Sequence, residues 1–267
     1  MLRMSLHKCM TRRLSHASLV NRLSRHSPCM SLRGNIVTVA ISCLLFVLVA
    51  CGDDDSDFAT RPSGGSSLSS SSVEPSSSVT LATPCKTDTE DNCVYGELVD
   101  DRDGQTYKTV KIDNQVWMAE NLNYEASPSY CYNDDTTNCT KQGRFYSWWT
   151  AIKVCPSGWH LPDTTEWKKL FTVVGDSSTV GLKLKSASGW NSSGNGTDDF
   201  GFSALSAGYR YSNGDYYAEG DNATFWSSTM RNYYSCYVAL YSERSDAILF
   251  SESKSIAYSV RCVKDDP

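Results

Sequence analysis

Residues 155–174 read CPSGWHLPDTTEWKKLFTVV, a stretch that combines a cysteine, a turn and the start of a helix. Asp163 and Glu166 have the spacing of a capping box, in which each side chain bonds the backbone N–H of the other residue. The predicted helix covers 166–174, and its apolar side chains fall on one face: Trp167, Leu170, Phe171 and Val174. The stretch therefore predicts one short amphipathic helix.

Short strands flank this helix in the sequence. Residues 105–112 and 115–119 are strand-like runs on either side of an Asp113-Asn114 turn, which predicts a hairpin. Residues 146–153 predict a second short helix, and residues 200–263 form short β segments divided by Gly, Asn, Asp and Ser. The fold class that we expect is α+β, with two short helices and several short antiparallel strands, rich in loops and stapled by disulfides.

Seven cysteines follow residue 51, and we expect six of them to form disulfides. Their spacing lacks the Cys-x-x-Cys pairs of a zinc site, and an exported chain meets an oxidising compartment. Cys85 with Cys93 and Cys131 with Cys139 each enclose a short polar loop, and Cys155 with Cys262 would join the middle of the domain to its last strand. A link from Cys155 to Cys236 is the alternative.

Cys236 is the odd cysteine. It alternates with Tyr234, Val238 and Leu240, which form the apolar half of a strand. We expect a buried free thiol at this position.

The N-terminal residues predict an export signal. An apolar run of 15 residues, 36–50, ends in Leu-Val-Ala followed by Cys51. As a helix it spans about 22 Å, short of the roughly 30 Å core of a bilayer, so a signal peptide is favoured over an uncleaved membrane helix. Leu-Val-Ala-Cys resembles the lipobox of bacterial lipoproteins, in which the cysteine is acylated and becomes the new N-terminus. Cys51 is therefore the predicted lipidation site and membrane anchor.

Residues 1–29 are rich in Arg, Ser and His. The Arg12-Arg13 pair suggests a twin-arginine signal, but three further arginines separate it from the apolar run. Met30 begins a normal short n-region. We interpret 1–29 as an N-terminal extension from an upstream start and 30–51 as the signal peptide.

Residues 52–93 predict a disordered tether rich in Asp and Ser, and residues 94–267 a globular domain. The tether cannot bury enough apolar area to offset the entropy of ordering, whereas all seven Trp and all fifteen Tyr follow residue 94. The three aspartates at 53–55 resemble the surface-export signals of Bacteroidota-like lipoproteins. We expect a lipid-anchored protein of the outer membrane, exposed at the cell surface.

The charge of the chain argues against nucleic acid as a partner. After Cys51 there are 18 basic and 30 acidic residues, a net charge of −12. An acidic surface repels phosphate backbones, and no stripe of Lys and Arg with interleaved aromatic residues is present.

Six motifs occur in order along the predicted domain: GQTY at 104–107, WMAENL at 117–122, CPSGWHLP at 155–162, DFGFSAL at 199–205, FWSST at 225–229 and SVRCV at 259–263. Together they resemble the Fibrobacter succinogenes major paralogous domain, over residues 94–265. Ser206, where that family often has Pro, and the extra thiol at Cys236 depart from the pattern. The resemblance implies a fold similar to the C-type-lectin-like and formylglycine-generating-enzyme group, and an exported lipoprotein.

No residue pattern indicates catalysis, a metal or a cofactor. His160 is the only histidine after Cys51, so a multi-histidine metal site is excluded, and we interpret His160 as a hydrogen-bonded structural residue. Formylglycine-type oxidation would need a reactive cysteine pair, and Cys262 is better placed in a disulfide. The Glu-Pro-Asn and Trp-Asn-Asp signatures of calcium-dependent lectins are absent, and Asp198-Asp199 predicts a turn rather than a calcium site.

A tyrosine-rich hairpin is the predicted ligand-binding patch. The Asn213-Gly214 turn is a strong hairpin signal, and adjacent Tyr216 and Tyr217 must point to opposite faces, so at least one is exposed. Exposed tyrosine offers a flat amphipathic surface to a sugar ring or a protein. The patch comprises Tyr211, Tyr216 and Tyr217, with Asn213 and Asp215 as polar neighbours.

The leading functional hypothesis is a non-enzymatic module of the cell envelope that recognises carbohydrate or a surface protein. A degenerate or unrecognised enzyme related to the formylglycine-generating group is one alternative. A structural envelope protein is the other.

Overall fold

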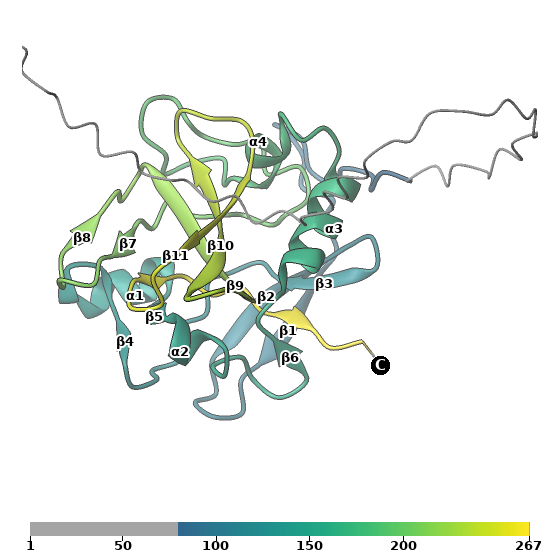
Figure 1. Cartoon of the computed structure of the whole chain (residues 1–267). Helices are drawn as coiled ribbons and strands as arrows, with labels where there is room; N and C mark the ends of the chain where they lie inside the picture. Colours follow the sequence, from purple (N-terminus) through teal and green to yellow (C-terminus); the bar gives the residue numbers. More distant parts are fainter. Residues whose placement is uncertain (1–79, 267) are drawn as a thin grey trace, which may run out of the picture. The chain divides into compact units, whose positions relative to one another are not determined.

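The computed structural model describes residues 80–266 (Figure 1). The predicted extension over 1–29, the signal peptide over 30–51 with Cys51, and the tether up to residue 79 lie outside the described residues. Three antiparallel sheets and a few short helices make up the described part, in agreement with the predicted α+β class.

The first sheet has five strands in the order β1-β2-β3-β13-β6. They are β1 (Tyr95–Val99), β2 (Thr106–Ile112), β3 (Gln115–Met118), β6 (Trp159–His160) and β13 (Val263–Lys264). The predicted hairpin is confirmed, because β2 pairs with β3 and Ile112 lies opposite Gln115. Asp113 has a φ of 52°, in the left-handed region that Asp and Asn tolerate best among residues with a side chain.

The second and third sheets use the C-terminal half of the domain. The second, in the order β11-β10-β9, contains β9 (Asn222–Arg231), β10 (Tyr234–Tyr241) and β11 (Ile248–Glu252). The third, in the order β4-β5-β12-β7-β8, contains β4 (Ser129–Tyr130), β5 (Phe145–Ser147), β12 (Ala257–Tyr258), β7 (Tyr209–Arg210) and β8 (Tyr216–Tyr217). Strands of two or three residues leave most of these chain segments as loops.

The helices are short, and there are more of them in the described part than the two that the sequence predicted. They are the 3-10 turn η1 (Tyr132–Asp134), α1 (Thr136–Gln142), α2 (Trp148–Ala151), α3 (Thr164–Val174) and α4 (Val180–Leu184). In α3 the predicted capping box is present: Asp163 Oδ1 accepts from the Glu166 N–H, and Glu166 Oε2 accepts from the Asp163 N–H, both at 2.8 Å. A satisfied N-terminus explains why this helix is the longest of the described part.

The helix predicted over 146–153 is mostly wrong. Residues 145–147 form β5, and only residues 148–151 are helical. Tyr146 pairs with Tyr258 across the sheet, and its hydroxyl donates to the Tyr124 carbonyl at 2.7 Å. Tertiary pairing of a buried tyrosine therefore overrides the local helical pattern.

Aromatic residues form the core around α3. Trp167 of α3 packs against Trp117 of β3 with ring centroids 4.7 Å apart, and against Phe225 of β9 at 5.9 Å. Phe202 contacts all three rings edge-on. A second buried cluster centres on Trp226, whose ring lies 4.5 Å from that of Tyr258. These contacts join the first two sheets through the helix.

Within the described residues, three disulfides join the pairs that the sequence predicted: Cys85–Cys93, Cys131–Cys139 and Cys155–Cys262. The prediction of a free thiol at Cys236 is wrong. Cys236 is buried as expected, but it is disulfide-bonded.

The folded domain begins before Val94. The Ala82 N–H donates to the Val173 carbonyl, the Cys85 N–H donates to the Asp199 carbonyl, and Lys86 forms an ion pair with Asp198 at 2.8 Å. The domain thus includes residues that the sequence pattern assigned to the tether over 52–93. The sheets and core clusters are built from residues 80–266, so this segment has its own hydrophobic core. No helix within it has the length and apolar character needed to span a bilayer.

Candidate functional site

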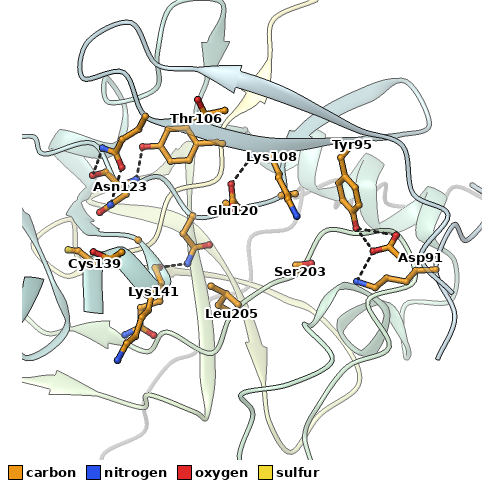
Figure 2. Close-up of a pocket in the computed structure, with 18 residues that line it drawn as sticks. Asp91, Tyr95, Thr106, Lys108, Glu120, Asn123, Cys139, Lys141, Ser203 and Leu205 are labelled. Atoms are coloured by element: carbon orange, nitrogen blue, oxygen red, sulfur yellow. Dashed lines mark hydrogen bonds and ion pairs between the residues drawn. The ribbon is translucent and has the colours of Figure 1, made fainter. Parts of the chain in front are cut away.

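A cleft of about 390 Å³ lies between β2, the segment that follows β3 and the C-terminal end of α1 (Figure 2). Figure 2 shows Lys108 and Glu120 on one side of the cleft, Lys141 on the other, and Asp91 with Tyr95 at one end. The lining is dominated by polar side chains from segments that are far apart in the sequence.

Consecutive residues of β2 line one wall of this cleft and differ in their exposure. Tyr107 is buried, whereas Thr106 and Lys108 on either side of it are exposed. The Lys108 N–H donates to Glu120 Oε2 at 2.7 Å, and the Lys108 ammonium lies 5.4 Å from the Tyr95 ring centre. The backbone of β2 therefore holds the Glu120 carboxylate at the wall of the cleft.

The opposite wall is the last turn of α1. Asn121 Nδ2 donates to the Gln142 carbonyl at 2.8 Å, which ties the end of the helix to the segment after β3. Gly143 follows with a φ of 77°, and a Cβ there would lie 2.6 Å from the Cβ of Asn121. Only glycine allows the chain to approach Asn121 this closely, and the close approach brings Lys141 and Gln142 to the cleft.

The charged groups of the cleft differ in how far they are neutralised. Lys86 is paired with Asp198 at 2.8 Å and Asp91 at 3.5 Å. Burial lowers the pKa of Lys86, but the hydrogen bond and charge of Asp198 outweigh it and raise that pKa overall. Within residues 80–266, neither Lys108 nor Lys141 forms an ion pair.

Amide side chains complete the lining. Asn123 Nδ2 donates to Gln105 Oε1 at 3.0 Å, and the Asn123 N–H donates to the Tyr107 hydroxyl at 3.1 Å. Amides, a carboxylate and ammonium groups together provide donors and acceptors for a polar ligand. The arrangement is suited to binding hydroxyl and carboxylate groups.

A second hollow of about 430 Å³ adjoins the cleft, because Lys141, Gln142 and Leu205 line both. Its other lining residues are mostly small or polar: Ser188, Gly189, Asn191, Ser206, Glu219 and Gly220. Gln142 Nε2 donates to Glu219 Oε1 at 3.2 Å across the junction. The two depressions form one continuous polar surface.

The tyrosine hairpin folds as predicted. Strand β7 pairs with β8, and Tyr209 lies opposite Tyr217. Tyr211 and Tyr217 are 44% and 43% exposed, with ring centres 6.4 Å apart. Asp215 accepts from the Tyr217 hydroxyl at 3.2 Å and from Asn213 Nδ2 at 2.8 Å. The structure therefore brings four of the five predicted patch residues together on one exposed turn.

The fifth patch residue, Tyr216, points to the other side of the hairpin. Its ring lies 5.3 Å from that of Tyr132, and its hydroxyl donates to Asp134 at 2.5 Å. Burial, followed by the hydrogen bond to Asp134, raises the pKa of Tyr216 to about 12. Tyr216 thus anchors the hairpin and is only partly exposed.

Three of the six sequence motifs meet at the buried Arg261, which is 0% exposed. Its Nε donates to Asn121 Oδ1 at 2.7 Å, its Nη1 to the carbonyls of Met118 at 3.0 Å and Phe202 at 2.6 Å, and its Nη2 to the Ser203 carbonyl at 2.8 Å. Burial lowers the pKa of Arg261 to about 9. The motifs WMAENL, DFGFSAL and SVRCV are therefore a single structural unit around one guanidinium.

The model of the Fibrobacter succinogenes major domain matches residues 110–264 of the chain, a span that contains five of the six motifs in full. The chain belongs to the Fibrobacter succinogenes major domain family. Among curated proteins and among solved structures, nothing matches it.

In this Fibrobacter succinogenes major domain, His160 joins three elements. Its Nε2 lies 2.8 Å from Glu166 Oε1 of α3, and its Nδ1 lies 2.6 Å from Asp265 Oδ1 beyond β13. Partial burial lowers the pKa of His160, but its two carboxylate partners outweigh that effect and raise it. Within residues 80–266, no three His, Cys, Asp or Glu side chains converge as metal ligands do.

The cleft was not predicted, although part of its signal lies in the motifs of the Fibrobacter succinogenes major domain. Gln105 belongs to GQTY, and Glu120 belongs to WMAENL. Lys141 had no such signal, because α1 has no apolar periodicity and depends on the Cys131–Cys139 disulfide and on the Asp135 side chain, which accepts from the Thr137 N–H at the start of the helix.

Proposed function

We propose that this protein is an exported, lipid-anchored protein of the cell envelope and that its domain is a carbohydrate-recognition module. The observation that carries the proposal is the cleft of Figure 2, whose lining includes Gln105, Glu120, Asn123, Lys141 and Gln142. Sugars are recognised by such planar amides and carboxylates, because each hydroxyl both donates and accepts a hydrogen bond.

The proposed location rests on the sequence. A lipobox-like Leu-Val-Ala-Cys ending at Cys51 and the aspartates at 53–55 support an acyl anchor in the outer membrane and display at the cell surface. Membership of the Fibrobacter succinogenes major domain family supports an envelope protein. The three short antiparallel sheets with few helices and three disulfides support the finer assignment to the C-type-lectin-like and formylglycine-generating-enzyme group.

The environment of His160 favours binding without catalysis. Both of its ring nitrogens are within hydrogen-bond distance of carboxylates, so neither is directed at a nucleophile. Cys262 is bonded to Cys155 in a disulfide, whereas an oxidation of the formylglycine type would need Cys262 as a thiol.

Recognition of a surface protein is a second candidate, favoured by a different surface. Tyr211 and Tyr217 are exposed on the β7–β8 hairpin beside Asp215. Tyrosine is enriched in protein interfaces, where a ring packs and its hydroxyl bonds to the partner. This candidate places the binding site on the hairpin and leaves the cleft empty.

A glycan array probed with residues 80–267, with and without calcium, tests the proposal. The glycan that it identifies is then titrated calorimetrically against the wild type and against two variants. Glu120→Gln keeps the shape of the cleft wall and should weaken binding by roughly tenfold, the effect of losing one charge-assisted hydrogen bond. Tyr217→Ala is the matched control on the hairpin and should leave the affinity unchanged.

The reverse result, with binding lost in Tyr217→Ala and kept in Glu120→Gln, would favour the hairpin. An array without any binding would contradict carbohydrate recognition altogether.

A further inference from the structure

We propose that the cleft binds an acidic oligosaccharide whose carboxylates pair with Lys108 and Lys141, and that the chain continues into the adjoining hollow beside Asn191 and Glu219. This inference rests on the proposed carbohydrate-binding function and names its ligand class.

Two lysines without an ion pair line one cleft of a domain that is acidic overall. Residues 80–266 contain 17 basic and 25 acidic residues, a net charge of −8. Lys108 of β2 and Lys141 of α1 nevertheless reach the same cleft from different walls, and neither has an ion pair within the described residues. An anionic ligand would neutralise both ammonium groups, whereas a neutral ligand would leave them unused.

Glu120 restricts the kind of anion that the cleft can bind. Its carboxylate lies in the same cleft, and within residues 80–266 the hydrogen bond that it accepts is at Oε2, from the Lys108 N–H. Any anionic oxygen placed beside this carboxylate would be repelled, so the position next to Glu120 suits a donor such as a hydroxyl, which a phosphate-rich ligand offers less often than a sugar. A carboxylated sugar supplies both complements, because its hydroxyls donate to Glu120 while its carboxylate accepts from the lysines.

The adjoining hollow indicates a chain rather than a single sugar. It is similar in size to the cleft, and Lys141, Gln142 and Leu205 are shared between the two. Gln142 contacts Glu219 across the junction, and Asn191 adds a further amide. Consecutive sugar residues can therefore occupy consecutive depressions, with Lys141 between them.

A matched pair of ligands tests the inference. A short oligogalacturonate and its full methyl ester have the same backbone and hydroxyls, and differ only in the negative charge of the carboxylates. Wild-type residues 80–267 should bind the acid about tenfold or more tightly than the ester, and added salt should weaken binding of the acid only. Lys108→Gln and Lys141→Gln should each lower affinity for the acid toward that of the ester and leave affinity for the ester unchanged.

Lys153→Gln is the control, because Lys153 is an exposed lysine outside the cleft. Equal or tighter binding of the ester, or an acid preference that survives both lysine substitutions, would overturn the inference while leaving carbohydrate recognition standing. If neither ligand binds and the glycan array finds only neutral sugars, the inference fails and the proposed function holds. If the array finds no glycan, both fail.

Discussion

Replacing Arg261 by methionine should lower the stability of the domain substantially, because the guanidinium donates four hydrogen bonds in the interior. Methionine fills much of the same space but donates none of them. The carbonyls of Met118, Phe202 and Ser203 and the Asn121 side-chain oxygen would then lose this donor. Removing one partner of a buried charged network costs about 3–5 kcal/mol.

The loss is partly offset, because the buried cation itself is costly, as the lowering of its pKa to about 9 indicates. We therefore expect a net destabilisation of about 3 kcal/mol, which for a domain of this size lowers Tm by roughly 6–12 °C. Thermal unfolding followed by circular dichroism measures it. Arg244→Met is the control, because Arg244 is exposed and its ion pair within residues 80–266 is with Asp246, so its loss should leave Tm nearly unchanged. Equal Tm values for the wild type and Arg261→Met would refute the role of Arg261 in joining the motifs.

Three further predictions concern the disulfides, His160 and the anchor. The Cys155–Cys262 and Cys131–Cys139 bridges join residues separated by 107 and 8 positions, which corresponds to about 4.8 and 2.5 kcal/mol of chain entropy. Replacing the cysteines of the long bridge by serines should therefore lower the free energy of unfolding in urea more than the same change in the short bridge. Equal losses would contradict this. The raised pKa of His160 means that its stabilising effect is complete below the unfolded value of about 6.5 and lost as pH rises through the higher folded value. The Tm difference between the wild type and His160→Gln should therefore be larger near pH 5 than near pH 9, and a pH-independent difference would show that the two carboxylates do not stabilise the imidazolium. Cys51→Ala should abolish metabolic palmitate labelling and leave uncleaved precursor, and label that survives the substitution would end the lipoprotein interpretation.

Local signals predicted those elements that local interactions determine. The hairpin of β2 and β3 follows from its Asp113-Asn114 turn, and α3 follows from the capping box of Asp163 and Glu166. The helix over 146–153 could not be excluded from the sequence, because what converts Tyr146 to a strand is its pairing with Tyr258, more than 100 residues away. Non-local pairing of this kind leaves no periodicity in either segment.

The candidate site was likewise predictable only where local sequence signals determine it. The exposed tyrosines of the β7–β8 hairpin were predictable, because alternation and the turn determine which rings point outward. The cleft was not, because its walls come from β2, the segment after β3 and α1, and α1 owes its position to a disulfide and to Gly143. Lys108 and Lys141 are ordinary surface lysines in the sequence, and only the fold brings them to one cleft.

The most direct test of the central claim is to map the amide chemical shifts of residues 80–267 by nuclear magnetic resonance during titration with the oligogalacturonate. The account predicts that the largest changes fall in residues 105–108, 119–123 and 139–143, with smaller ones near Asn191 and Glu219. Changes centred on residues 211–217, with the cleft signals unmoved, would contradict it.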